Sequence, residues 1–257
     1  MTLTPPAILV VAGLCGLLVG SFLNVCIFRL PLGASVVWPA SACGGCKREL
    51  RWFENIPIVS WLVLGARCAR CQAPISIQYP LVEAVTAVLF VLVAALTPVS
   101  PLLFARLIFV CALIVLFAID LAHQILPNVI TLPGIAVGLA FALLGPPGWL
   151  AAVLGALLGG GLLYAIAAGY YLLRKEEGLG MGDVKMLAMI GAFLGWQAVL
   201  LTLVLASFAG AIIGVLLIAA QRGSMKYALP FGTFLALGAL VAMLAGQPII
   251  DWYAGFY

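Results

Sequence analysis

The chain has 257 residues, of which 66% are hydrophobic and only 8% carry a charge. Soluble domains carry roughly 25% charged residues, so this composition excludes a water-soluble enzyme and a disordered chain. A net charge of +4, scattered along the sequence, is also too small for a nucleic-acid groove. The expected surroundings are a lipid bilayer, and the expected fold is an all-α polytopic membrane protein.

Residues 1–28 are expected to form the first membrane helix. The stretch from Ala7 to Phe28 is apolar, and no basic residue precedes Arg29. This stretch is longer than the apolar core of a signal peptide, so we expect a retained span.

Residues 29–80 differ sharply in composition and predict a small extramembrane domain. They contain four of the seven cysteines, in two CxxC pairs: Cys43, Cys46, Cys68 and Cys71. Two such pairs direct four sulfur atoms at one centre, which is the usual pattern of a structural zinc site. Two disulfides or four idle thiols are the alternatives, although disulfides are rare in a reducing compartment. A site closed by four sulfurs leaves no position for water, so the metal is expected to be structural.

Residues 81–257 are expected to hold the remaining spans. Pro, Gly or charged residues interrupt this region near residues 97–101, 120–128, 145–148, 174–185 and 221–226. The uncharged stretch between Lys185 and Gln221 would make a helix of roughly 50 Å, too long for one crossing, so we expect a turn near Gly195, Trp196 and Gln197. The total is about eight membrane helices.

The basic residues predict the orientation in the membrane. Eleven of the 12 Lys and Arg residues lie in loops that fall on one side of an eight-helix chain, and only Arg106 is left over. By the positive-inside rule these loops face the cytoplasm. We therefore expect both termini outside and the zinc domain in the cytoplasm.

Two of the three aspartates, Asp120 and Asp183, are the candidate catalytic residues. Each is expected at the cytoplasmic end of a span, where an ionisable group is costly and usually functional. Two adjacent carboxylates share a proton, so one acts as a base toward water and the other as an acid. Asp183 as the N-cap of a helix beginning at Val184, and Asp120 as an ion ligand, stay open as alternatives.

The sequence gives weaker indications of a functional role for the other polar residues. His123 lies three residues after Asp120, and Lys185 two after Asp183, but a structural or anchoring role is as reasonable for either. Asp251 is expected on the opposite side of the membrane. Some cytoplasmic glutamates are hypothesised to receive a basic substrate segment: Glu49, Glu54, Glu83, Glu176 and Glu177.

Five motifs, in chain order, resemble the type IV prepilin peptidase family. They are GSFLNVCIFRLP at 20–31, the cysteine region with ENIPIVSW and ISIQYPLVE up to residue 83, DLAHQILPN at 120–128, GMGDVK at 180–185 and LPFGTFLALG at 229–238. The family has eight spans, which is similar to the pattern expected here. Gly44 and Thr233 stand where the family commonly has Pro, and we expect neither to touch a proposed acid or metal ligand.

The resemblance implies a bifunctional enzyme of the bacterial inner membrane. It would cleave the leader of a type IV prepilin or type II secretion pseudopilin at the cytoplasmic face, with Asp120 and Asp183 as catalytic residues. It would then methylate the new N-terminal residue from S-adenosylmethionine, although no glycine-rich loop marks a site for this donor. The four cysteines would hold Zn²⁺.

Two other functions are weighed against this one. An ion-coupled transporter with a regulatory zinc domain predicts internal repeats and polar groups at mid-membrane, and neither is visible in the sequence. An intramembrane aspartic protease that cuts within spans would share the GxGD element but lack the paired CxxC motifs.

Overall fold

The computed structural model describes residues 5–176, 180–220 and 229–255, and these residues form helices and loops without a β-strand. They form two compact units, Met1–Leu103 and Phe104–Tyr257. The described helices of 14 or more residues are α1 (Pro6–Arg29), α3 (Gln78–Leu96), α4 (Pro101–His123), α5 (Asn128–Ala142), α6 (Trp149–Arg174), α7 (Met181–Leu194), α8 (Trp196–Ala220) and α9 (Phe231–Ala254).

Six of these helices are long and apolar enough to cross a bilayer, and α5 and α7 are the exceptions. With 15 and 14 residues, each is roughly 21 to 23 Å long, shorter than a hydrocarbon core of about 30 Å. The described residues thus form an all-helical membrane protein with six candidate spans and two shorter helices, α5 and α7, where the sequence predicted about eight spans. The shortness of the helix before residue 195 agrees with the expected early turn.

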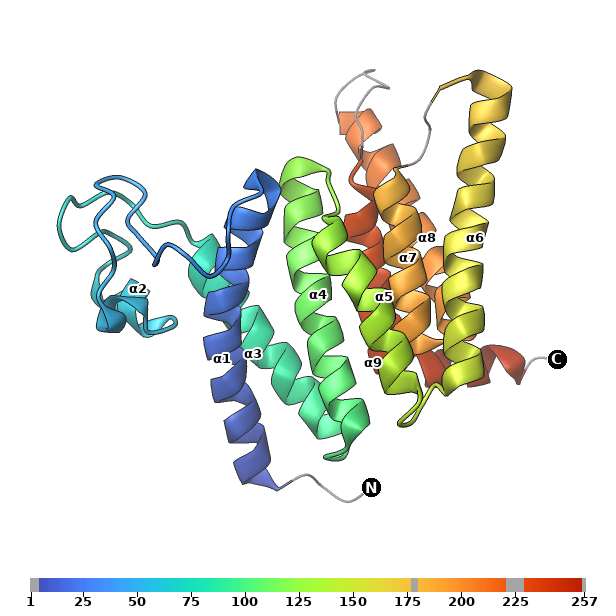
Figure 1. The fold of residues 1–257 in the computed structure, drawn as a ribbon, viewed down its shortest axis with the longest axis horizontal. Coiled ribbons are helices and arrows are strands. Elements are labelled where there is room, and N and C mark those ends of the chain that lie inside the picture. The colour runs from blue at the N-terminus through green and yellow to red at the C-terminus, as the bar shows by residue number, and fades with distance from the viewer. Residues whose placement is uncertain (1–4, 177–179, 221–228, 256–257) are drawn as a thin grey trace. The chain divides into compact units, whose positions relative to one another are not determined.

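The first unit is built on the pair α1 and α3, joined by an extramembrane segment. Gly16 and Gly20 allow the two helices to touch, since a Cβ on either glycine would lie 2.6 Å or 2.7 Å from a Cα atom of α3. Small residues at such contacts are typical of helices in lipid. The connecting segment contains the short helices η1 (Leu30–Leu32), η2 (Trp52–Asn55) and α2 (Val59–Val63). It is coloured from blue to cyan in Figure 1.

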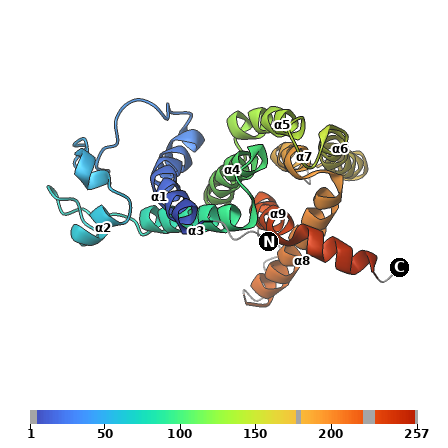
Figure 2. The same ribbon diagram turned by 90° about the horizontal axis from the view of Figure 1, so that it is seen from below.

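The second unit is organised around α7. Eight of its 14 residues are buried, and α7 contacts α5, α6, α8 and α9. Figure 2 shows α7 lying beside α5 and α6. Phe193 of α7 also stacks on Phe109 of α4, with ring centroids 4.8 Å apart. The short helix α7 is therefore the core of this unit.

The junction between α7 and α8 confirms the predicted turn. α7 ends at Leu194, Gly195 adopts a φ of +83°, and α8 begins at Trp196. A left-handed φ is easily adopted only by glycine, so Gly195 allows the reversal.

The outer helices present apolar side chains on the molecular surface. α8 is the clearest case, because only 11% of its most apolar 18-residue window is buried. A helix that is apolar on all sides yet exposed is stable only in a non-aqueous solvent. This exposure supports the assignment to a membrane.

Candidate aspartate site and metal centre

Asp120 lies near the C-terminal end of α4 and contacts the N-terminal end of α9. Its side chain is 4% exposed. Its Oδ2 accepts two hydrogen bonds from Thr233, one from the backbone N–H at 2.6 Å and one from the hydroxyl at 3.0 Å. Pro230, which precedes α9, provides no side-chain cap, so N–H groups in the first turn are available to a distant partner. Asp120 is that partner.

Asp183 is the third residue of α7 and is half-buried. The residue before α7 is Gly180, and a Cβ on it would lie 3.3 Å from Asp183 Oδ2, so the carboxylate folds back over the start of its own helix. A negative charge is favoured in the first turn of a helix. The alternative in which Asp183 caps a helix beginning at Val184 is wrong, because α7 already begins at Met181.

Leu126 connects the surroundings of the two aspartates. A Cβ added to Gly182 would lie 2.9 Å from Leu126 Cβ, and one added to Gly232 would lie 2.9 Å from Leu126 Cδ1 and 3.0 Å from Asp120 Oδ2. Leu126 can therefore approach the backbone of both positions this closely only because they are glycines without a Cβ atom. Leu126 thus lies beside Gly182, the neighbour of Asp183 in sequence, and beside Gly232, which contacts Asp120, at the junction of α4, α7 and α9.

Thr233 is the residue of this site that sequence reasoning missed. The expectation that it touches no proposed acid is wrong, because both of its donors reach Asp120 Oδ2. The sequence contains one signal for this contact. Pro230 cannot cap the helix that follows it, so the N–H groups of the first turn, which includes Thr233, need an acceptor from elsewhere. Its partner lies 113 residues away, and only the tertiary structure identifies it.

Lys185 and His123 lie near the aspartates without a described bond to either. Lys185 Nζ donates a hydrogen bond to Asn128 Oδ1 at 2.9 Å, which joins α7 to the start of α5. His123 is the last residue of α4 and is exposed. A role for Lys185 in fixing α5 against α7 follows from its bond.

The two CxxC pairs form knuckles with the same backbone pattern, offset by 25 residues. In the first, Cys43 N–H donates to Arg48 O and Lys47 N–H donates to Cys43 O, both at 2.9 Å. In the second, Cys68 N–H donates to Ala73 O at 2.9 Å and Gln72 N–H donates to Cys68 O at 3.1 Å. The residue after each pair has a positive φ of 57°. Each knuckle therefore presents two sulfurs from one tight turn.

The four sulfur atoms of Cys43, Cys46, Cys68 and Cys71 lie within 4.8 Å of one another. The Sγ atoms of Cys43 and Cys71 are 3.7 Å apart. Tetrahedral zinc with bonds of about 2.3 Å holds its sulfurs about 3.8 Å apart. The spacing fits a four-sulfur zinc site.

Hydrogen bonding prepares part of this cluster for metal binding. The backbone N–H groups of Cys71 and Arg70 lower the pKa of the Cys68 thiol to about 6. The Ala73 N–H lowers the pKa of the Cys71 thiol. Burial and the neighbouring thiols outweigh this effect and raise the pKa of Cys71 to about 11. Four adjacent thiols do not all ionise by themselves, whereas a bound cation stabilises all four thiolates. The remaining cysteines lie outside the cluster: Cys15, Cys26 and Cys111.

Comparison with known proteins assigns each unit to a described domain. The bacterial peptidase A24 N-terminal domain matches residues 14–97, and the type IV leader peptidase family matches residues 107–215. A prepilin leader peptidase/N-methyltransferase of Aeromonas hydrophila is 39% identical over 267 residues, which cover 93% of this chain and 91% of the relative. The chain belongs to the type IV leader peptidase family.

Other relatives in the family carry the same name. The Pseudomonas aeruginosa protein is 38% identical over 281 residues, which cover 98% of this chain and 95% of the relative. The Myxococcus xanthus protein is 44% identical over 213 residues, which cover 82% of this chain and 63% of the relative. No solved structure matches.

The glutamates of this leader peptidase family member have different surroundings. Glu83 is 6% exposed and accepts a hydrogen bond from Ile58 N–H at 2.7 Å, so it is not available to a substrate. Glu54 pairs with Arg48 at 2.7 Å, and this guanidinium lowers the pKa of Glu54. Glu49 and Glu176 are exposed, and Glu177 lies outside the described residues. The hypothesis of substrate-binding glutamates is therefore wrong for Glu83.

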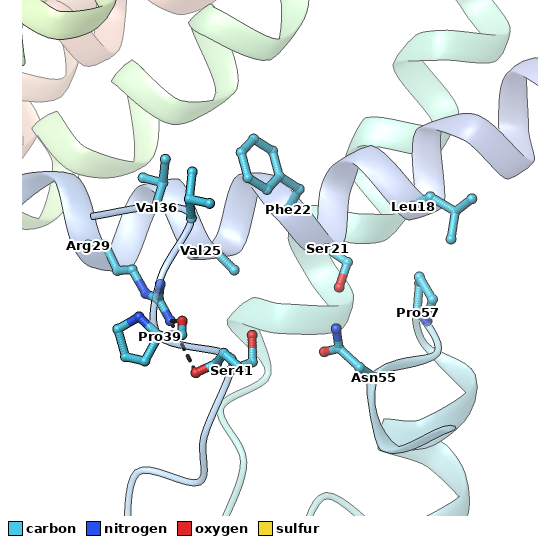
Figure 3. Close-up of a pocket in the computed structure, with 12 residues that line it drawn as sticks. Leu18, Ser21, Phe22, Val25, Arg29, Val36, Pro39, Ser41, Asn55 and Pro57 are labelled. Carbon is cyan, nitrogen blue, oxygen red and sulfur yellow. Dashed lines mark hydrogen bonds between the residues drawn. The ribbon is translucent and has the colours of Figure 1, made fainter. Parts of the chain in front are cut away.

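A cavity of about 310 Å³ lies in the first unit, between α1 and the extramembrane segment. Figure 3 shows Ser21, Asn55 and Ser41 around it, together with Arg29, whose guanidinium donates to three backbone carbonyls of the segment. Its size is at the lower end of small-molecule sites. Its one charged lining group is this cation, and the lining contains no carboxylate. No group in this lining marks a site for S-adenosylmethionine, and we assign no methyl-transfer step to this cavity.

Proposed function

We propose that the protein is a membrane aspartic endopeptidase that removes the leader of a type IV prepilin or type II secretion pseudopilin. The observation that supports this most directly is the junction of α4, α7 and α9, where Leu126 lies beside Gly182, next to Asp183 in sequence, and beside Gly232, which contacts Asp120. The names of the relatives support the choice of substrate. An ion-coupled transporter has no comparable support.

The proposed chemistry uses one carboxylate as a base and the other as an acid. The ionised member takes a proton from the water that attacks the carbonyl carbon of the scissile peptide bond. The protonated member donates a hydrogen bond to the carbonyl oxygen as negative charge develops on it. When the C–N bond breaks, the leaving amine takes up a proton from the dyad, which regenerates the pair.

The location of the reaction follows from the proposed topology. With both termini outside and the extramembrane segment in the cytoplasm, the junction of α4, α7 and α9 lies at the cytoplasmic face of the bacterial inner membrane. The positive charges of residues 29–80 agree with this orientation. A substrate leader would then be cut where the chain emerges from the bilayer.

The second proposed activity is methylation of the new N-terminal residue. When bound, S-adenosylmethionine supplies the methyl group to the amine that cleavage exposes. The names of the relatives support this activity. In the first unit the four clustered cysteines would hold a structural Zn²⁺, which stabilises a segment too small for a large core.

The deciding experiment compares aspartate variants of the full chain on a model prepilin. Asp120→Asn and Asp183→Asn should each lower the cleavage rate roughly a hundredfold to ten-thousandfold, because either change removes half of the dyad. Asp251→Asn is the matched control, because Asp251 is exposed at the other end of α9 and bonds to Gln247.

Mass spectrometry of the product measures both proposed activities, cleavage and methylation. Loss of the leader reports cleavage, and an added methyl group reports transfer from S-adenosylmethionine. Near-normal cleavage by either site variant, with zinc content unchanged, refutes the dyad.

A further inference from the structure

We propose that Thr233 is a positioning residue for Asp120, and that its backbone N–H and its hydroxyl together hold Oδ2 so that Oδ1 exchanges the proton with substrate water. The inference rests on the proposed aspartic peptidase function. The observation that carries it is the pair of hydrogen bonds, at 2.6 Å and 3.0 Å, that end on the same carboxylate oxygen.

The backbone N–H of Thr233 can only donate, so Oδ2 is the acceptor of the bond at 2.6 Å. With the hydroxyl donating as well, as we propose, the proton of the dyad is not on Oδ2. Both partners are buried, at 4% and 5% exposure, where hydrogen bonds to a charged group are strong. Thr233 therefore stabilises negative charge on Asp120 and fixes the rotation of its carboxyl group.

The surrounding backbone adds to the same effect. Thr233 is the third residue of α9, so Asp120 lies at the positive end of that helix dipole. Gly232 lies directly against Asp120, and a Cβ there would be 3.0 Å from Oδ2 and 3.1 Å from Cγ. Asp183 has no described hydrogen bond from another residue to its carboxylate in residues 5–176, 180–220 and 229–255. The two donors on Asp120 assign the base to Asp120, which leaves the acid to Asp183.

The two bonds depend on the residue type at position 233. A proline at this position would have neither an N–H nor a hydroxyl. Serine retains both donors, whereas valine has the shape of threonine and retains the backbone N–H alone. These substitutions separate hydrogen bonding from packing.

The test compares Thr233→Val, Thr233→Ser and Thr202→Val in the purified full chain with a model prepilin. Thr202 is the matched control, because it is fully buried in α8 and its hydroxyl has no partner among the described residues. Thr233→Val should lower kcat roughly tenfold to a hundredfold with KM within about twofold, because the charged acceptor loses one of two donors. Thr233→Ser and Thr202→Val should retain kcat.

Three outcomes contradict the inference. A kcat of Thr233→Val within about twofold of the starting protein shows that the hydroxyl is dispensable. Equal losses in Thr233→Val and Thr233→Ser show that the methyl group matters instead of the donor. A change in KM alone shows a role in substrate binding. If Thr233→Val unfolds at the assay temperature, Thr233→Ala and Thr233→Ser are compared at a lower temperature by the same criteria.

The aspartate variants separate failure of this inference from failure of the proposed function. If Asp120→Asn or Asp183→Asn cleaves at a near-normal rate, the dyad itself is wrong. If both are inactive and Thr233→Val is unaffected, only the role of Thr233 is wrong.

Discussion

Gly191 of α7 packs directly against Gly155 of α6, backbone to backbone. A Cβ on Gly191 would collide with the carbonyl group of Gly155, and a Cβ on Gly155 would lie 2.8 Å from the carbonyl carbon of Gly195. Small residues allow helices in lipid to approach this closely. The contact fixes α7, and α7 carries Asp183.

We expect Gly191→Ala to destabilise the second unit by at least about 1–3 kcal/mol, because the added methyl group has no space and must separate the helices. The thermal midpoint of the purified protein, measured by loss of helical circular dichroism, checks this. Gly161→Ala is the matched control on α6, since a Cβ there meets no atom within 4 Å. Equal midpoints for the two variants would show that the helices repack without cost.

We expect Cys43→Ser and Cys68→Ser to lower the zinc content, because each removes one of four sulfur ligands and metal binding is coupled to folding of the segment. Elemental analysis of the purified variants gives the zinc-to-protein ratio. Cys15→Ser should keep the original ratio, because Cys15 lies in α1 outside the cluster. A full complement of zinc in both ligand variants would contradict the assignment.

We expect Glu83→Ala to loosen the extramembrane segment. Glu83 Oε2 accepts the N–H of Ile58, whose φ of +60° is unfavourable for a β-branched residue and needs a partner to hold it. Loss of this bond should cost about 1–3 kcal/mol, and limited proteolysis between α1 and α3 should become faster. Glu83→Gln keeps an acceptor and should restore part of the protection.

Glu49→Gln is the control for that experiment, since Glu49 is exposed in the same part of the chain. If the Glu83→Ala and Glu49→Gln variants are cleaved at the same rate, the buried carboxylate of Glu83 does not stabilise the segment.

The sequence by itself determined those features that depend on residues close together in the chain. The paired CxxC motifs predicted a four-sulfur cluster, and the structure places the sulfurs within 4.8 Å, because the ligands of each knuckle are three residues apart and one tight turn is enough to align them. The apolar composition predicted membrane helices, since a run of apolar residues is stable in lipid whatever it contacts. The turn at Gly195 was also predictable, because glycine adopts its φ easily.

Contacts between distant segments were decided only by the tertiary structure. The sequence selected Asp120 and Asp183 as the acids, but it gave no reason for Thr233 to donate two hydrogen bonds to one of them, and it grouped Glu83 with solvated glutamates although that side chain is buried. Helices in lipid are apolar on several sides, so their sequence periodicity does not specify their neighbours. Which helix ends meet is fixed by the close packing of glycines against backbone around α7, and that packing depends on the whole fold.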